Sequence, residues 1–148
     1  MEIPAIHHLG HIEELRFTIS PSFEPMLSLR LLSDVEGALR TYRLECQIMG
    51  IATNAGSWEV SVGTAAAEAL LADFAGQDLD RKATSSIGVD GVTYSLDFGS
   101  GPERVTLRWW SALPRQWRGL TPLLRRLLRL AGPRAKGFER HLRPSQMN

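Results

Sequence analysis

The sequence has a single cysteine, two lysines and no long run of apolar residues among its 148 positions. One cysteine, Cys46, excludes an internal disulfide and any zinc site built from several cysteines. No stretch approaches the roughly 18 apolar residues that cross a bilayer, and the first residues do not have the pattern of a secretion signal. These absences predict a cytoplasmic protein without a membrane span, in which Cys46 is an ordinary buried thiol.

The motifs that carry common enzymatic chemistry are also missing. The chain contains no GxSxG nucleophile turn, no GxxxxGK[ST] phosphate loop and no GxGxxG dinucleotide motif. Its four histidines lie near the two ends of the sequence, so neither Cys46 nor any serine has a histidine beside it to act as a base. We therefore predict that the protein is not an enzyme and holds no cofactor.

Three of the histidines stand together in the stretch AIHHLGHIEE, which ends on two glutamates. In a helix, His7, His11 and Glu14 would share one face and could bind a metal ion together. A proline and a glycine in and beside this stretch disfavour a helix, whereas a strand would point His7 and His8 to opposite faces. We predict no metal site here, with a small metal-dependent enzyme using these histidines as an alternative.

Charge is distributed unevenly along a chain whose net charge is +1. Residues 1–80 carry a net charge of −8 and residues 81–148 carry +9. A chain of this length builds one domain. The simpler interpretation is that acidic and basic faces complement each other inside that domain, and the alternative is a separate basic half that binds a partner.

Alternation of apolar and polar residues predicts six strands. Four of them, near residues 14–20, 26–32, 39–48 and 58–62, are joined by short turns and predict an antiparallel meander. Two more, over 92–98 and 105–110, predict a hairpin in which Phe98 lies opposite Val105.

A change to helical periodicity predicts two helices. Thr64 is the expected N-cap of the first helix and Gly76 its end, and Thr121, Pro122 and Gly132 are expected to mark the two ends of the second. We therefore predict one α+β domain over residues 1–132. Its antiparallel sheet consists of the N-terminal meander and the C-terminal hairpin, two helices pack on one face, and a flexible, basic, polar tail follows over residues 133–148.

Tryptophan and arginine are concentrated in the stretch LRWWSALPRQWR. Trp110 falls on the outward side of its predicted strand, near Arg108, and Trp117 follows a few residues later. Because both residue types are enriched at interface hot spots, we predict that Trp110, Trp117 and Arg108 bind a protein partner. The alternatives are that this half binds nucleic acid or an anionic surface, or that both tryptophans pack under the last helix.

A family resemblance rests on the block VDGVTYSLDFGSGPERVTLRWWSALPRQWRGLTPLLRRLLRLAG, with its DGxxY hairpin, its WW pair, a further tryptophan and a leucine-rich helix. This block resembles the C-terminal part of many small bacterial proteins. Over roughly residues 14–131, the order of elements is similar to that of emfourin-type protease inhibitors and of immunity proteins from interbacterial toxin systems. The resemblance implies a non-enzymatic domain that binds a protein, and we interpret the chain as an immunity protein that neutralises a cognate toxin.

The acidic first half suggests how such a partner would be attracted. Acidic residues including Glu13, Glu14, Asp34 and Glu36 are expected to steer a basic toxin toward the surface that binds it. The sequence leaves the identity of that partner and the oligomeric state open.

Overall fold

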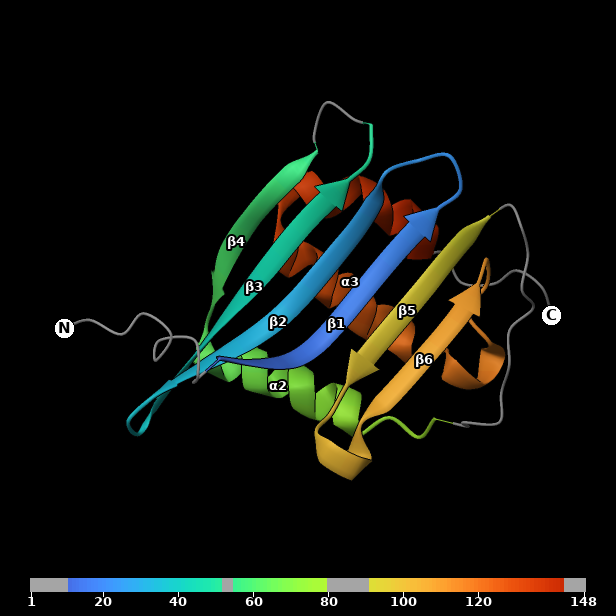
Figure 1. Ribbon diagram of the computed structural model, residues 1–148. Helices are drawn as coiled ribbons and strands as arrows, with labels where there is room; N and C mark the ends of the chain where they lie inside the picture. The colour runs from blue at the N-terminus through green and yellow to red at the C-terminus, as the bar shows by residue number, and fades with distance from the viewer. Residues whose placement is uncertain (1–10, 52–54, 80–90, 143–148) are drawn as a thin grey trace.

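The computed structural model describes residues 11–51, 55–79 and 91–142 (Figure 1). Strands and helices follow the predicted order, and short 3-10 segments lie between and after them. The elements are β1 (His11–Pro21), β2 (Met26–Glu36), β3 (Leu39–Met49), β4 (Gly56–Val62), α2 (Thr64–Ala75), β5 (Val92–Phe98), η1 (Gly101–Glu103), β6 (Val105–Trp110), η2 (Arg115–Trp117), α3 (Leu120–Ala131) and η3 (Pro133–Leu142). The predicted α+β fold class is therefore confirmed.

The strands form one antiparallel sheet in the order β4-β3-β2-β1-β5-β6 (Figure 1). Strands β1 to β4 are the predicted meander, and the β5–β6 hairpin has the predicted register, with Phe98 opposite Val105. The hairpin joins the sheet at β1, where Phe17 lies opposite Leu96. Strand β1 is consequently an interior strand that pairs on both sides.

Both long helices cover the same face of the sheet (Figure 1). The inward side chains of the strands and the leucines of α3 form one core, which includes a cluster of aromatic rings. Trp109 stacks on Tyr94 with 5.1 Å between ring centroids, and Trp117 packs edge-on against Trp109 at 6.1 Å. In the part of the chain that the structure describes, no helix has the length and apolar character needed to cross a membrane.

Strand β1 contains a bulge at Glu14. The register with β2 shifts from Glu13 opposite Leu32 to Leu15 opposite Leu31, so Glu14 is the extra residue. Its carboxylate accepts a hydrogen bond from the Ser33 hydroxyl at 2.7 Å. The bulge thereby removes Glu14 from the alternation of inward and outward side chains along β1.

Helix α2 begins one residue earlier than predicted, at Thr64 itself, after Gly63. The Thr64 hydroxyl does not cap the helix, because it donates a hydrogen bond to the Arg40 carbonyl of β3 at 3.4 Å. The prediction of Thr64 as N-cap was wrong, whereas Gly76 follows the helix as expected.

Helix α3 begins two residues earlier than predicted, at Leu120. The chain enters it directly from η2, and the Thr121 N–H already bonds the Arg118 carbonyl at 3.2 Å. Thr121 and Pro122 are consequently the second and third residues of the helix, and their predicted capping roles were wrong. Gly132 follows the helix in a left-handed conformation with φ 94°, as its placement there predicted.

Residues 133–142 do not form the flexible tail that we expected, because they fold as η3 against the core. Ala135 and Leu142 are buried, and the Tyr94 hydroxyl donates a hydrogen bond to the His141 carbonyl. The Arg125 guanidinium also reaches the Leu142 carbonyl at 3.4 Å. The packed domain therefore extends to Leu142, beyond the predicted boundary at residue 132.

Candidate partner-binding face

The sheet face opposite α2 and α3 has no helix over it among the residues described in the structure (Figure 1). We call it the outer face. Its side chains are the outward members of the strand alternation, and most of them are polar or charged. They include Glu13, Arg16, Ser28, Arg30, Asp34, Arg43, Glu45, Gln47, Ser57, Glu59, Thr93, Ser95, Thr106, Arg108 and Trp110.

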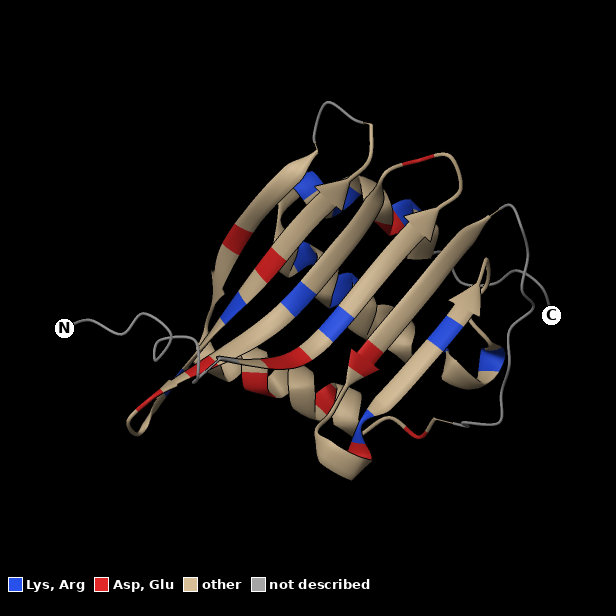
Figure 2. Ribbon diagram, viewed as in Figure 1, with Lys and Arg blue, Asp and Glu red and all other residues tan. Residues whose placement is uncertain are grey.

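Acidic and basic positions are interspersed across this face (Figure 2). Glu13 on β1 accepts bonds from Arg16 at 2.8 Å and from Arg30 on β2 at 2.6 Å. Arg30 also binds Glu45 on β3 at 2.8 Å. A chain of ion pairs thus links three neighbouring strands.

Arg43 continues this chain of ion pairs toward the edge of the sheet. Its guanidinium lies 3.0 Å from the carboxylate of Asp34 and 3.1 Å from that of Glu45, and it also pairs with Glu59 on β4. Arg104 approaches Glu13 at 3.5 Å from the other side. We call the whole set the ion-pair network, and its four arginines balance its four carboxylates.

The network determines the charge state of Glu13. Partial burial alone would raise the pKa of this carboxyl, but hydrogen bonds from Arg30 and Arg16 outweigh burial and lower the pKa below its usual value. Glu13 is therefore ionised and already paired at neutral pH, and Asp34 is likewise bound to Arg43. Neither carboxylate presents the free negative charge that we expected to steer a basic partner.

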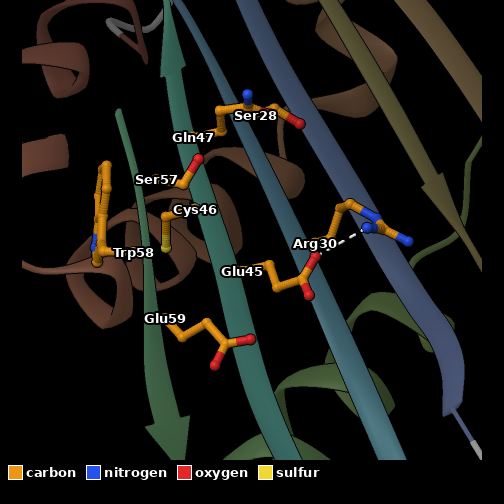
Figure 3. Close-up of a pocket in the computed structure, with 8 residues that line it drawn as sticks. All are labelled: Ser28, Arg30, Glu45, Cys46, Gln47, Ser57, Trp58 and Glu59. Carbon is orange, nitrogen blue, oxygen red and sulfur yellow. Dashed lines mark hydrogen bonds and ion pairs between the residues drawn. The ribbon is translucent and has the colours of Figure 1, made fainter. Parts of the chain in front are cut away.

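A groove of about 370 Å³ lies on β2, β3 and β4, lined in part by Arg30, Glu45, Gln47, Ser57 and Glu59 (Figure 3). Arg30 and Glu45 point toward one another across the two strands that carry them. The lining offers hydroxyl, amide, carboxylate and guanidinium groups beside apolar carbon surface. Such a surface can hydrogen-bond a polar segment of another molecule.

Cys46 and Trp58 also line the groove, but neither offers a reactive group there. Burial raises the pKa of the Cys46 thiol to about 12, so the sulfur is protonated at neutral pH and is not a thiolate nucleophile. The Trp58 indole donates to the Ala131 carbonyl at 2.8 Å on the helix side, and the Arg134 guanidinium lies 4.3 Å above its ring. Cys46 is thus the buried thiol that the sequence predicts.

Trp110 and Arg108 lie on the outer face of β6, as predicted. Trp110 is opposite Thr93 and half-buried, and Arg108 is opposite Ser95 and exposed. The Trp110 ring lies against Gly91, since a Cβ on that glycine would come within 2.9 Å of the indole nitrogen. The edge of the outer face therefore carries one large aromatic side chain with an arginine nearby.

The remaining predicted site residues lie elsewhere. Trp117 is only 3% exposed and packs on Trp109, so it is not an anchor on the surface; its predicted binding role gives way to the alternative of core packing. Glu14 is bound by Ser33 and lies 3.6 Å from Arg40. Glu36 is exposed at the end of β2, where the hairpin to β3 begins. The structure thus brings Glu13, Asp34, Arg108 and Trp110 onto one face, with Glu36 in line with Asp34 at the hairpin end of β2, and leaves Glu14 and Trp117 outside it.

The histidine stretch is only partly described. His7 and His8 lie outside the described residues, and His11 is the first residue of β1. Over residues 11–51, 55–79 and 91–142, no group of three or more histidine, cysteine, aspartate or glutamate side chains is arranged to hold a metal ion.

Two exposed apolar residues, Phe23 and Ile51, were missed by the sequence analysis. Phe23 lies in the turn between β1 and β2, and Ile51 follows the end of β3. An indication was present for the first, because Phe23 stands between Pro21 and Pro25, where a turn was expected and no strand alternation could bury it.

The comparisons with known proteins add no relative. Family models, curated proteins and solved structures were all searched, and none matches this chain.

Proposed function

We propose that the chain is a non-enzymatic protein-binding domain that binds its partner on the outer face. The observation that carries this proposal is a broad sheet face without a helix over it in the described part of the chain, with Trp110 and Arg108 at one edge and a polar groove at the other. Aromatic and arginine side chains are the usual hot spots of such interfaces. The groove supplies hydrogen-bonding groups around them.

The finer form of the proposal is a cytoplasmic immunity protein that binds and neutralises a bacterial toxin. Two observations support this form. The order of elements resembles that of immunity proteins, and the single thiol of the chain, Cys46, is buried and protonated and therefore offers no nucleophile. Because the ion-pair network is internally balanced, we infer that this face recognises its partner by shape and hydrogen bonding more than by long-range attraction.

The first test measures binding to a candidate toxin encoded beside this gene, by calorimetry and by growth rescue on co-expression. Trp110→Ala should weaken binding about 30-fold, the effect of losing one hot spot. Thr106→Arg, which adds bulk to the outer face from an exposed position, should weaken it similarly without touching the core.

Ala69→Arg is the matched control, because Ala69 is exposed on α2, on the helix side of the sheet. It should leave binding unchanged. If Ala69→Arg abolished binding while Trp110→Ala and Thr106→Arg did not, the binding face would be the wrong one. Elemental analysis of the same purified sample tests the metal-enzyme alternative, since stoichiometric metal lost on replacing His7, His8 and His11 would favour that alternative.

A further inference from the structure

Two residues with exposed apolar side chains lie at one end of the sheet. At this end β1 turns into β2 and β3 ends (Figure 1). Phe23 is 96% exposed and Ile51 is fully exposed. The segments that carry them touch, because a Cβ on Gly50 would lie 3.2 Å from the Pro25 Cα. We call this end of the sheet, formed by residues 21–25 and by Gly50 and Ile51, the turn end.

Phe23 adopts a backbone conformation that its side chain disfavours. Its φ is 64°, in the left-handed region, which is unfavourable for a residue with a bulky side chain. An exposed ring buries nothing within the fold that could offset this cost. A strained residue that contributes nothing to its own core points to a contact outside the molecule.

Positive charge borders the turn end. The segment η3 lies against it, since Pro133, Phe138 and Arg140 share a hollow of about 380 Å³ with Pro21 and Pro25. Within η3, three basic side chains, Arg134, Lys136 and Arg140, are exposed, against the single acidic residue Glu139. Arg140 also pairs with Glu24 of the β1–β2 turn, which links the charged segment directly to the apolar one.

We propose that the turn end docks onto an anionic lipid bilayer. Phe23 and Ile51 enter the boundary between headgroups and acyl chains. Arg134 and Lys136 of η3 bind the headgroups, while Arg140 pairs with Glu24. Protruding apolar side chains bordered by positive charge are the combination that attaches proteins peripherally to such membranes. A protein partner would need pockets for both convex side chains, whereas a bilayer accepts them without a preformed pocket. The site is separate from the outer face, so this proposal does not rest on the proposed function.

The test is co-sedimentation of the full chain with vesicles of phosphatidylcholine alone or mixed with phosphatidylglycerol. We expect binding to the mixed vesicles that falls as salt is added. Replacing both apolar residues, Phe23→Asn with Ile51→Asn, should weaken this binding at least about tenfold. Phe23→Asn alone should also raise the thermal stability, because asparagine tolerates a positive φ, and this separates loss of binding from loss of folding.

Leu39→Asn is the matched apolar control, because Leu39 is 62% exposed in the β2–β3 hairpin at the opposite end of the sheet. It should bind vesicles like the unchanged chain. Equal weakening by Leu39→Asn would overturn the proposal, as would the absence of binding to mixed vesicles, which would leave the turn end to a protein partner.

Lys136→Glu tests the charged part of the site and should weaken binding about tenfold. Its control is Arg118→Glu, the same change of charge at an exposed position near the far end of the sheet. The position of Arg118 follows from its neighbours. Gly119, the next residue, adjoins Gln77, and Gln77 lines a hollow together with Gly99 in the β5–β6 connection. Equal effects of the two variants would mean that net charge, not the turn end, governs binding, and would contradict the proposal.

Discussion

At the scale of single residues, Glu13 is one centre of the ion-pair network, because this carboxylate pairs with Arg16, Arg30 and Arg104. Its side chain is partly buried, so these contacts are less exposed to water than an ordinary surface pair. Removing the charge would leave Arg30 with Glu45 as its other ion-pair partner on the face. Part of the contribution of the network to stability therefore depends on this carboxylate.

Glu13→Gln should lower the free energy of unfolding by about 1 kcal/mol at pH 7. The pKa of Glu13 is lower in the folded state than in the unfolded chain, so the carboxylate stabilises the fold at pH values above its unfolded pKa. That contribution disappears as the pH falls through the folded pKa.

Urea unfolding of both proteins across this pH range checks the sign. The difference between wild type and Glu13→Gln should be largest near neutral pH and should shrink under acidic conditions, where both side chains are uncharged. A difference that stays constant down to strongly acidic pH would show that the lost stability comes from packing and not from ionisation of Glu13.

Residues also differ in how far the sequence reveals their place. Trp110 could be assigned to the outer face because it continues the alternation of β6. Trp117 comes from the same tryptophan-rich stretch, but it lies in an irregular segment, and its burial depends on packing against Trp109. Phe23 was missed because its exposure and its φ arise from the geometry of a turn that has no periodicity.

At the scale of elements, η3 is the largest departure from the sequence-based expectation. Its buried residues Ala135 and Leu142 and the half-buried Phe138 follow an i, i+3, i+7 spacing, but the segment is short and mostly polar, and this spacing was missed. Tertiary hydrogen bonds hold η3 in place. The Tyr94 hydroxyl donates to the His141 carbonyl, and the Arg125 guanidinium donates to the Leu142 carbonyl. The strands were predictable because each one alternates over several residues.

Leu142→Ala should lower the free energy of unfolding by about 2–3 kcal/mol, because it leaves a cavity where η3 meets the core. Lys136→Ala in the same element should change it by less than about 0.5 kcal/mol, since Lys136 is exposed. Thermal unfolding followed by circular dichroism distinguishes them. Equal, small effects would mean that η3 does not contribute to the stability of the domain in solution.

At the scale of the whole molecule, the two oppositely charged halves of the sequence form one sheet. Strand β1 from the first half pairs with β5 from the second, and ion pairs such as Arg126 with Asp73 and Arg140 with Glu24 connect the halves. These contacts support the interpretation that much of the charge is complemented within the domain. The sequence could predict the hairpin but not its place in the sheet, because pairing with β1 links strands more than 70 residues apart.

A fragment of residues 1–79 should therefore not fold alone. It lacks both β5, which pairs with β1, and α3, whose leucines cover the same core. We expect this fragment to aggregate or to unfold without cooperativity, and to gain cooperative unfolding when mixed with a fragment of residues 80–148. Cooperative unfolding of the first fragment by itself would show that the meander is an independent domain.

The ion-pair network also affects how this surface can change during evolution. Arg30 and Arg43 each hold carboxylates on more than one strand, so replacing either one alters contacts across the sheet while leaving the core beneath untouched. A single mutation can therefore rearrange the hydrogen-bonding pattern presented by several strands without endangering the fold. Such a surface can acquire a new binding specificity through a small number of mutations. The same property means that most substitutions in the ion-pair network also change recognition of the existing partner.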